Sequence, residues 1–306
     1  IVLILEIERQ KILLRLITAM ITPFKDNREV DFKIAQELAL GLSHSGSDGI
    51  LIGGTTGESP TLNEEEKLRL FSEVKKAVGN DIAVIAGTTD NDTKYSIELS
   101  KKAQDNGADA LLLTVPAYNK PTQEGLLRHF TQIADSVKIP GILYNVPGRT
   151  ALNMNTETTL KLSEHNNIIG VKEACSDQAQ ISSIIKSTDE DNFKVWSGND
   201  DETFTIMSSG GYGVVSVASN IIGNQIKSMM TDILEGSTKD ASLKNESMMP
   251  LFKALFWVTN PILIKRALNI SNFNVGGLRM PMFDNNEFQN EFKKVLSNFK
   301  IDVISS

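Results

Sequence analysis

Several features that mark particular protein classes are scarce or absent in this chain. It has one cysteine, Cys175, so no disulfide can form within the chain, and a reducing compartment is the expected setting. The histidines, His44, His129 and His165, lie too far apart in the sequence to match a zinc-ligand spacing. No Gly-x-Gly-x-x-Gly pattern opens the first predicted helix, which argues against a bound nucleotide. We therefore expect no metal and no cofactor.

Excess positive charge and long apolar runs are also missing. Lys and Arg number 31 against 38 Asp and Glu, a formal net charge of −7, and no dense basic block occurs, so neither nucleic acid nor an anionic membrane is an expected partner. No apolar run reaches the ~20 residues of a membrane span. Residues 1–15 begin apolar but lack a basic leader, and we interpret them as an N-terminal extension rather than a signal peptide. A cytoplasmic location is expected.

What the chain does contain is a repeated alternation of short apolar runs and longer amphipathic segments. The runs are rich in Ile, Leu and Val without strict alternation, which is typical of parallel strands that are buried on both faces. The predicted strands are Leu16–Ile21, Gly49–Gly53, Ile82–Gly87, Ala110–Val115, Gly141–Val146, Ile168–Lys172, Lys194–Ser197 and Gly213–Val217.

The segments between these runs have helical spacing. Two clear cases are Asp31–Leu42 and Glu64–Val78, and Asn63 with Glu66 has the spacing of a capping box at the start of the second. So many strand and helix units in succession favour a closed α/β barrel of the (β/α)8 (TIM barrel) type over an open doubly wound sheet.

Beyond Gly223 the strand signals stop, and helices are predicted at Met248–Val258 and Pro261–Ile270. We accordingly divide the chain into an extension (1–15), a catalytic barrel domain (16–236) and a C-terminal helical region (237–306). No Pro-, Gly- or Ser-rich linker separates the last two, so we expect them to pack together.

One lysine stands at the end of an otherwise apolar run. In Ile168-Ile169-Gly170-Val171-Lys172-Glu173-Ala174, strand alternation places Gly170 and Lys172 on one face, and the missing side chain of Gly170 leaves room beside the lysine. Burial lowers the pKa of a lysine and exposes a nucleophilic amine, which is what covalent catalysis on a ketone requires. A lysine that extends to solvent or forms a salt bridge is the alternative.

Other predicted strands also end in unusual residues, and in a barrel the carboxyl ends of the strands form the active site. Gly54-Thr55-Thr56-Gly57-Glu58-Ser59 can hold a carboxylate, or can be a flexible turn before a helix cap. The tyrosine of Tyr144-Asn145-Val146-Pro147-Gly148-Arg149-Thr150 can transfer protons, and its arginine can bind a carboxylate. Tyr118 lies on a proline-bounded loop, where packing or an interface is the simpler role.

Taken together, these motifs resemble the dihydrodipicolinate synthase (4-hydroxy-tetrahydrodipicolinate synthase) family, within the pyruvate-dependent class I aldolase and N-acetylneuraminate lyase superfamily. The resemblance runs from about Leu16 to Pro281. It also includes segments of lesser individual weight: Tyr118-Asn119-Lys120-Pro121, Ser197-Gly198-Asn199-Asp200, Gly213-Val214-Val215-Ser216-Val217 and Asn260-Pro261.

The resemblance implies a lyase that condenses pyruvate with L-aspartate 4-semialdehyde to 4-hydroxy-tetrahydrodipicolinate, the first committed step of lysine and diaminopimelate biosynthesis. Lys172 would form the Schiff base with pyruvate, and Tyr144 would transfer protons through Thr55 and through Tyr118. In the family Tyr118 comes from a neighbouring subunit of a homotetramer (a dimer of dimers) or a homodimer. The remaining roles concern substrate binding: Thr56 and the Val215 carbonyl at pyruvate, Arg149 at the second substrate, and Gly198 where the backbone can meet a ligand.

The sequence departs from the common family pattern at a few positions. Ala117 replaces a frequent second tyrosine, and Glu64, Lys67 and Tyr95 stand where lysine-inhibited relatives carry His and Glu, which predicts insensitivity to lysine. Cys175 is expected to be a small buried residue rather than a reactive thiol.

Two alternative functions remain open. The first is another pyruvate-dependent aldolase, such as N-acetylneuraminate lyase or a keto-deoxy sugar acid aldolase. Such relatives generally lack Arg149, and Thr55-Thr56 is commonly Ser-Thr in the neuraminate enzymes. The second is a non-catalytic relative that binds pyruvate without turning it over.

Overall fold

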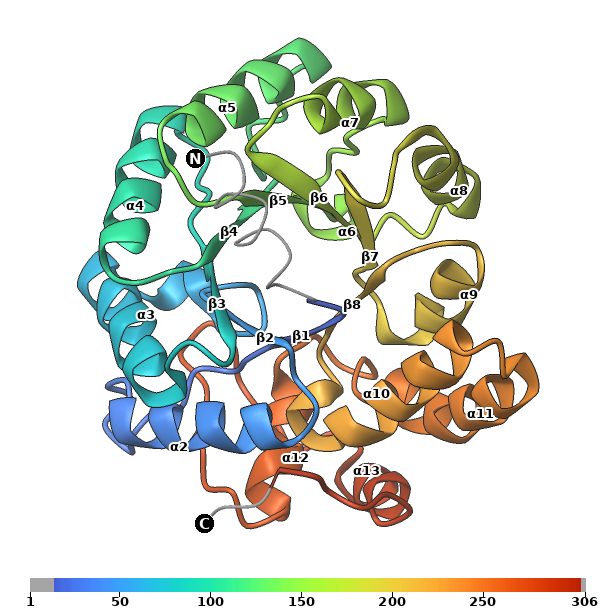
Figure 1. The fold of residues 1–306 in the computed structure, drawn as a ribbon. Helices are drawn as coiled ribbons and strands as arrows, with labels where there is room; N and C mark the ends of the chain where they lie inside the picture. The colour runs from blue at the N-terminus through green and yellow to red at the C-terminus, as the bar shows by residue number, and fades with distance from the viewer. Residues whose placement is uncertain (1–13, 304–306) are drawn as a thin grey trace.

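The strands of this chain close into a cylinder. In the computed structural model, which describes residues 14–303, the strands run parallel in sequence order around a closed barrel, and the last pairs with the first (Figure 1). This confirms the predicted (β/α)8 fold. The strands are β1 (Leu16–Ala19), β2 (Gly49–Ile52), β3 (Ala83–Gly87), β4 (Ala110–Thr114), β5 (Gly141–Asn145), β6 (Ile168–Glu173), β7 (Lys194–Ser197) and β8 (Gly213–Ser216).

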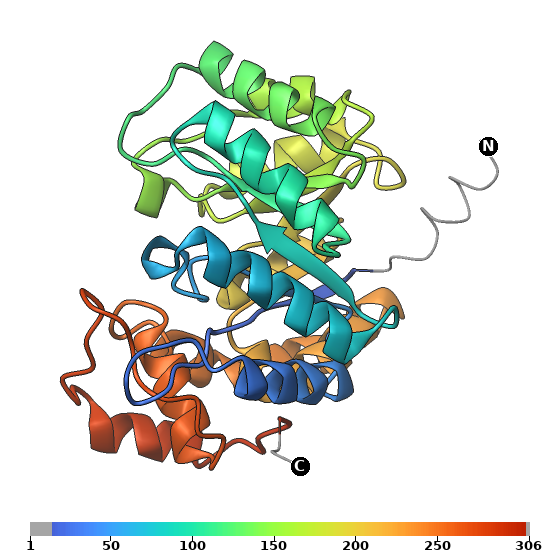
Figure 2. The same cartoon turned by 90° about the vertical axis from the view of Figure 1, so that its left-hand side faces the viewer.

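A ring of helices surrounds the barrel, and further helices follow it at the C-terminal end of the chain. The helices are α2 (Phe32–His44), α3 (Glu64–Val78), α4 (Thr93–Asp105), α5 (Gln123–Asp135), α6 (Pro147–Thr150), α7 (Thr156–Ser163), α8 (Gln178–Ser187), α9 (Thr203–Ser208), α10 (Ser219–Leu234), α11 (Thr238–Ala254), α12 (Ile262–Ile270) and α13 (Gln289–Leu296), with short 3₁₀ turns η1 (Ser59–Thr61) and η2 (Asp200–Glu202). Figure 2 shows the C-terminal helices against one flank of the barrel, where α12 packs on α10 and α13 on α11.

The predicted ranges of the strands agree with the structure at one end or both, and β1 shows why the other end can differ. The predicted strand Leu16–Ile21 is too long, because β1 ends at Ala19. The backbone N–H of Ile21 bonds to the side chain of Asn220 at 3.4 Å instead of to a neighbouring strand. Conversely, β6 continues one residue beyond the predicted end, through Glu173, which pairs with Ser197 of β7.

The helix predictions were best where a local signal defined the boundary. The helix α3 has the predicted bounds, and the capping box is present: Asn63 accepts from the Glu66 N–H at 2.9 Å, and Glu66 accepts from the Asn63 N–H at 3.0 Å. The predicted helix Met248–Val258 was wrong at both ends, because α11 begins at Thr238 and ends at Ala254, with Pro250 inside it. No helix among residues 14–303 is both long and apolar enough to span a membrane.

The core has two layers, as in other barrels of this type. The larger layer lies between strands and helices, and the smaller one fills the barrel interior. Leu14 and Arg15, within the predicted extension, already contact the barrel: the Leu14 carbonyl accepts from the Trp196 indole at 2.6 Å, and the Arg15 carbonyl accepts from the Val214 N–H at 2.8 Å. Residues 1–13 of that extension lie outside the described residues.

Gly170 is a position where the barrel interior leaves no room for a side chain. A Cβ built on it would overlap the carbonyl oxygen of Lys194 and would meet the Trp196 ring at 2.5 Å. Gly170 therefore leaves space on its strand as predicted, and the Trp196 ring occupies that space. The indole is fully buried and packs edge-to-face on Tyr212, with ring centroids 5.4 Å apart.

This packing predicts that Gly170→Ala destabilises the protein, because either the strand or the indole must move. We expect the free energy of unfolding to fall by about 1–3 kcal/mol, as is typical of overpacked cores. Urea denaturation measures this change. Gly148→Ala is the matched control, because a Cβ there meets nothing within 4 Å. An equal stability for the two variants would contradict the packing argument.

Candidate active site

Lys172 points into the barrel interior near the carboxyl end of β6. Its register partners are Tyr144 on β5 and Trp196 on β7, and its side chain is only 6% exposed. The amine Nζ lies 4.1 Å from the centroid of the Tyr144 ring. Burial lowers the pKa of Lys172 to about 7, Asp200 opposes that shift, and the positive charge of Arg149 adds to it. A large share of the amine is therefore neutral and nucleophilic near neutral pH.

Tyr144 is the second buried polar group of the site. Burial raises the pKa of Tyr144 to about 12, while the charge of Arg149 and a hydrogen bond with the Thr55 side chain partly offset this increase. The phenol consequently remains protonated at neutral pH. The structure thus brings together Lys172 from β6, Tyr144 from β5 and Thr55 from the loop after β2, as the sequence predicted for an active site at the strand ends.

Arg149 lies on the short helix α6, directly after β5. Pro147 begins this helix, where a missing backbone N–H is harmless. The side chain of Arg149 is exposed, and it makes no hydrogen bond or ion pair with any of residues 14–303. Its charge nonetheless acts on both Lys172 and Tyr144. A guanidinium in that position is free to bind a carboxylate.

The loop 53–59 after β2 is anchored on several sides. Gly53 has φ +70°, a left-handed conformation that glycine adopts without strain, and it turns the chain at the end of the strand. Thr56 is 3% exposed, and its Oγ1 accepts a hydrogen bond from Asn260 Nδ2 at 2.9 Å. The next carbonyl, of Gly57, accepts from the Thr22 hydroxyl at 2.7 Å. These contacts favour an ordered loop, called the cradle loop below (residues 53–59), over the alternative of a flexible turn.

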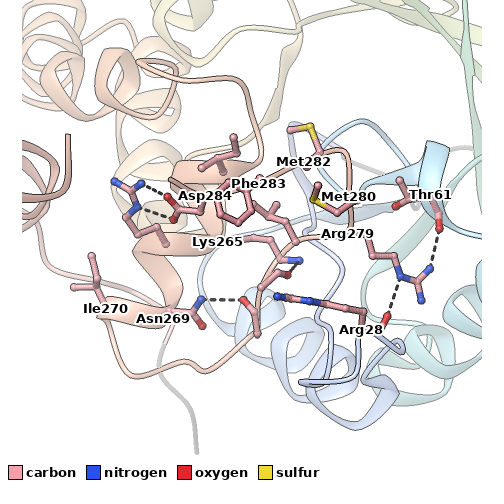
Figure 3. A pocket seen from close by; sticks show the side chains of 15 residues that line it. Arg28, Thr61, Lys265, Asn269, Ile270, Arg279, Met280, Met282, Phe283 and Asp284 are labelled. Carbon is pink, nitrogen blue, oxygen red and sulfur yellow. Dashed lines mark hydrogen bonds and ion pairs between the residues drawn. The ribbon is translucent and has the colours of Figure 1, made fainter. Parts of the chain in front are cut away.

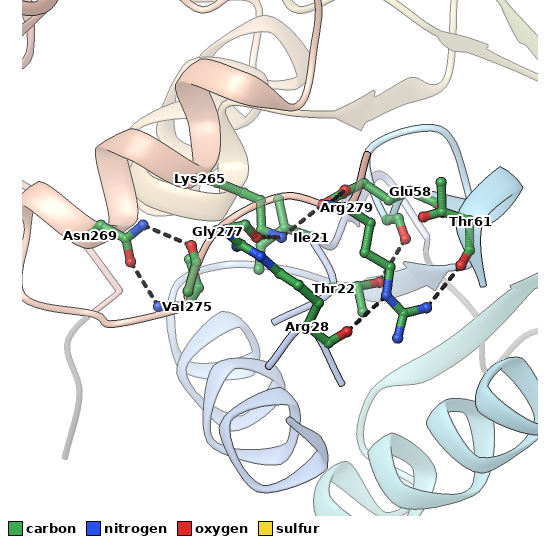
Figure 4. Close-up of polar contacts among 12 residues, drawn as sticks. Ile21, Thr22, Arg28, Glu58, Thr61, Lys265, Asn269, Val275, Gly277 and Arg279 are labelled. Atoms are coloured by element: carbon green, nitrogen blue, oxygen red, sulfur yellow. Dashed lines mark hydrogen bonds and ion pairs between the residues drawn. The ribbon is translucent and has the colours of Figure 1, made fainter. Parts of the chain in front are cut away.

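Glu58 attaches the same loop to the C-terminal helices. Its carboxylate accepts from Lys265 Nζ at 2.7 Å and from the Arg279 backbone N–H at 3.0 Å, and the Lys265 amine also donates to the Gly277 carbonyl at 2.6 Å (Figure 4). Both members of the ion pair are almost wholly buried. Burial lowers the pKa of Lys265 to about 8, and Glu58 opposes the shift. The loop therefore depends on helix α12 for its position.

Val215 and Gly198 lie at the ends of strands that flank this region. Val215 is on β8, opposite Ile17 of β1, and its side chain belongs to the interior layer. Gly198 follows β7 and donates its N–H to the Glu173 carbonyl at 2.6 Å, and an added Cβ would lie 2.6 Å from that of Ala174. Close packing on β6 thus accounts for the glycine, and contacts of either residue with substrate remain predictions.

Tyr118 is the one predicted residue that the structure does not bring to the site. Its side chain is 90% exposed, and its φ of +70° is unusual for a residue with a side chain. The loop is nevertheless attached, because the Ala117 N–H donates to the Asn91 side chain at 3.1 Å and Asn119 donates to the Asn91 carbonyl at 3.0 Å. Among the described residues, no hydrogen bond links Tyr118 to Tyr144 or Thr55.

No role was predicted for Asp200, although it lies in one of the segments that carry the family resemblance. This carboxylate is buried, and its Oδ2 accepts from the backbone N–H groups of Val217 at 3.1 Å and Ala218 at 2.9 Å. Its negative charge raises the pKa of Lys172. Asp200 therefore ties the end of β7 to the end of β8 and places a negative charge near the amine.

No functional role was predicted for Glu173 or Cys175 either. Glu173 is the last residue of β6, directly after Lys172, and Cys175 follows the strand. Glu173 is fully buried and accepts from Asn145 Nδ2 at 3.1 and 3.3 Å. Burial raises the pKa of Glu173 to about 7. Cys175 is only half-buried, which corrects the prediction of a buried residue, but burial and the neighbouring Glu173 raise the pKa of its thiol to about 12, so it stays protonated.

A cavity of about 810 Å³ lies away from these residues, between α12 and the segment 276–284 (Figure 3). It contains none of the predicted site residues. Its polar lining is mostly paired internally: Lys265 with Glu58, Arg266 with Asp284, and Arg279 with Glu66. Size alone does not identify a binding site, and we place the active site at the strand ends, where a neutral amine and an unpaired guanidinium lie close together.

The fold and the site define a class of protein: a (β/α)8 barrel with a buried, Schiff-base-competent lysine beside a tyrosine. The sequence matches the Dihydrodipicolinate synthetase family over residues 12–299. It is 54% identical over 273 residues to a 4-hydroxy-tetrahydrodipicolinate synthase of Dehalococcoides mccartyi strain CBDB1, an alignment that covers 89% of this chain and 92% of that one. The chain belongs to the dihydrodipicolinate synthetase family.

Solved structures agree with this assignment. The enzyme of Cyanidioschyzon merolae, solved with lysine bound, is 41% identical and has a TM-score of 0.91, covering 93% of this chain and 97% of that one. The chloride-inhibited enzyme of Acinetobacter baumannii, complexed with pyruvate, is 35% identical with a TM-score of 0.90, covering 94% of this chain and 98% of that one.

The low pKa of Lys172 predicts the pH dependence of its reaction with pyruvate. The protonated amine cannot attack a ketone, so the initial rate of borohydride-trapped adduct formation should rise as pH increases through about 7 and level off above about 8. A lysine with the ordinary pKa of ~10.4 would instead gain about tenfold per pH unit up to pH ~9. Continued growth of that kind would show that burial does not depress the pKa.

Proposed function

We propose that this chain condenses pyruvate with L-aspartate 4-semialdehyde to form 4-hydroxy-tetrahydrodipicolinate. The observation that carries this proposal is the buried Lys172 amine above the Tyr144 ring, because this pairing supplies a neutral nucleophile next to a proton donor. The family assignment and the names of the relatives support it. The reaction is the first committed step of lysine and diaminopimelate biosynthesis, for which a cytoplasmic location is proposed.

The first half of the reaction activates pyruvate. The Lys172 amine attacks the ketone carbon, and loss of water gives an iminium. Loss of a proton from the methyl group then leaves an enamine. The iminium is a cation in a dry interior, so neutral hydroxyl and amide groups such as those of Thr56 and its loop can hold the carboxylate without quenching the positive charge that withdraws electrons. The Val215 carbonyl is proposed to contact the same part of the substrate.

The second half forms the new carbon–carbon bond. The enamine carbon attacks the aldehyde of the second substrate, and the amine of that substrate then displaces Lys172 as the ring closes, which regenerates the free enzyme. Tyr144, protonated because of its raised pKa, donates and recovers protons through Thr55. Arg149 is proposed to bind the carboxylate of the second substrate at the entrance, where its guanidinium has no partner among residues 14–303.

A neighbouring copy of the chain completes the relay in this proposal. Tyr118 is exposed and held in a left-handed conformation on an anchored loop, which suits a side chain presented outward to another subunit. We therefore propose a homo-oligomer, either a homodimer or a homotetramer, in which Tyr118 of one subunit reaches the Thr55 and Tyr144 of another.

Borohydride reduction in the presence of pyruvate, followed by peptide mass spectrometry, tests the chemistry. We expect a pyruvate adduct on Lys172 and turnover of aspartate 4-semialdehyde in preference to sugar aldehydes. Arg149→Gln should raise the KM for the semialdehyde by about tenfold or more, since one charge-assisted contact is lost, and should leave the adduct intact. Arg128→Gln is the control, because Arg128 is exposed on α5 and forms an ion pair with Glu124 of the same helix. The absence of any adduct would rule out this function.

Insensitivity to lysine is proposed from the residues of α3 and α4. Glu64 forms an ion pair with Lys102 at 2.5 Å. Burial raises the pKa of Tyr95 and the Glu64 carboxylate adds to this shift, so these groups interact with one another. We expect millimolar lysine to leave the rate nearly unchanged. The Cyanidioschyzon merolae enzyme, solved with lysine bound, is the comparison in the same assay. Strong inhibition of this chain would refute the proposal.

A further inference from the structure

Asn260 connects the C-terminal region to loop 53–59, which is proposed to hold the pyruvate carboxylate. No individual role was predicted for it. It lies between α11 and α12, and it is 5% exposed. Its Nδ2 donates to Thr56 Oγ1 at 2.9 Å, across 204 residues of sequence. The contact therefore links the loop after β2 directly to a segment outside the barrel strands.

The direction of this hydrogen bond determines what the Thr56 hydroxyl can do. An amide NH₂ group only donates, whereas a threonine hydroxyl both accepts and donates. Because Asn260 donates, Thr56 accepts there and keeps its own proton. The side chain of Thr56 makes no second hydrogen bond with residues 14–303, so the proton is available to a ligand. A carboxylate, which only accepts, is the chemical partner that fits.

The other end of the same amide supports a functional reason for this arrangement. Asn260 Oδ1 is buried and accepts no hydrogen bond from any described residue. Leaving a buried acceptor unpaired is unfavourable, native structures keep few such groups, and a functional role is one explanation for those they keep. A residue selected only for stability at this position would use both ends of its side chain or have no polar end at all.

The surroundings hold Asn260 in place relative to the cradle. On the adjoining helix α12, the buried Lys265 amine binds Glu58, which is on the same loop as Thr56 (Figure 4). The loop and the start of α12 are therefore connected at two points. A buried ion pair adds little net stability but can fix the register of two elements, which suits this role.

We propose that Asn260 is a positioning residue for pyruvate: by donating to Thr56 Oγ1, it orients the Thr56 hydroxyl so that its proton faces the pyruvate carboxylate. The C-terminal helical region thus forms part of the pyruvate site, although it holds no group that reacts. This inference rests on the proposed function. It adds that Asn260 acts through Thr56 and on the affinity for pyruvate, and that it leaves the Lys172 chemistry itself unchanged.

Asn260→Asp tests the donor requirement with almost no change of shape. The carboxylate can only accept, so it would take the Thr56 proton and place a negative charge near the substrate carboxylate. We expect the pyruvate concentration for half-maximal borohydride trapping, and the KM for pyruvate, to rise by about tenfold or more, while the KM for the semialdehyde and the adduct at saturating pyruvate are retained. Asn274→Asp is the matched control, because it adds the same charge and keeps the acceptor for the Gly276 N–H.

A double-mutant cycle separates this role from simple structural support. Asn260→Ala removes the donor without adding charge, and Thr56→Val removes the hydroxyl. If Asn260 acts through Thr56, the double variant should bind pyruvate no more weakly than Thr56→Val alone. This cycle also serves if Asn260→Asp does not fold, which circular dichroism and thermal melting report.

Two results would overturn the inference: an unchanged pyruvate dependence in Asn260→Asp, which is also the result expected if Oδ1 accepted the Thr56 proton, or additive effects of Asn260→Ala and Thr56→Val. Failure of the proposed function is distinguishable from both, because in that case the unmodified chain itself forms no pyruvate adduct.

Discussion

The proposed chemistry depends on the exclusion of water from the Lys172 amine. Lys172 needs a neutral nitrogen to act as a nucleophile, and the barrel interior lowers its pKa to about 7 by removing water from it. That environment has to be built from neighbouring strands, and β5, β6 and β7 supply it. Tyr144 lies under the amine, and Trp196 occupies the space that Gly170 leaves open. The indole N–H of Trp196 donates to the Leu14 carbonyl, so this buried polar group also has a hydrogen-bond partner.

Two groups of opposite charge, Arg149 and Asp200, act on this amine. Burial lowers the pKa of Lys172; Asp200 opposes this shift and Arg149 adds to it. Burial raises the pKa of Tyr144, and Arg149 partly offsets that increase. Each of the two lies at a different strand end, and neither neutralises the other through a direct ion pair among the described residues. The same guanidinium that favours a neutral lysine is available for a substrate carboxylate. One exposed cation thus lowers the pKa of the buried amine and is also able to bind a carboxylate.

The C-terminal region participates in the site because the cradle loop needs external support. Loop 53–59 contains Glu58 in a left-handed conformation, which is costly for a residue with a side chain. Lys265 and the Arg279 backbone hold that carboxylate, and Asn260 holds Thr56. The helices that follow the barrel therefore support the part of the active site that the barrel strands do not reach.

Sequence reasoning succeeded where a signal is local. The apolar runs indicated the barrel strands, the spacing of Asn63 and Glu66 defined the start of α3, and the motifs around Lys172, Tyr144 and Thr55 identified groups that the structure brings together. It failed at both ends of the predicted helix Met248–Val258, because α11 begins at Thr238 and ends at Ala254. It assigned no role to Asp200, because the partners that make it significant lie on another strand.

The residue types and their order along the chain thus determined the barrel and the family. Tertiary structure alone decided two further features: that the Trp196 ring fills the space beside Gly170, and that Asn260 donates to Thr56 from 204 residues away. The physical reason is the range of the forces. Strand and helix signals act within a few residues, whereas desolvation and hydrogen bonding depend on what the closed barrel places within a few ångströms.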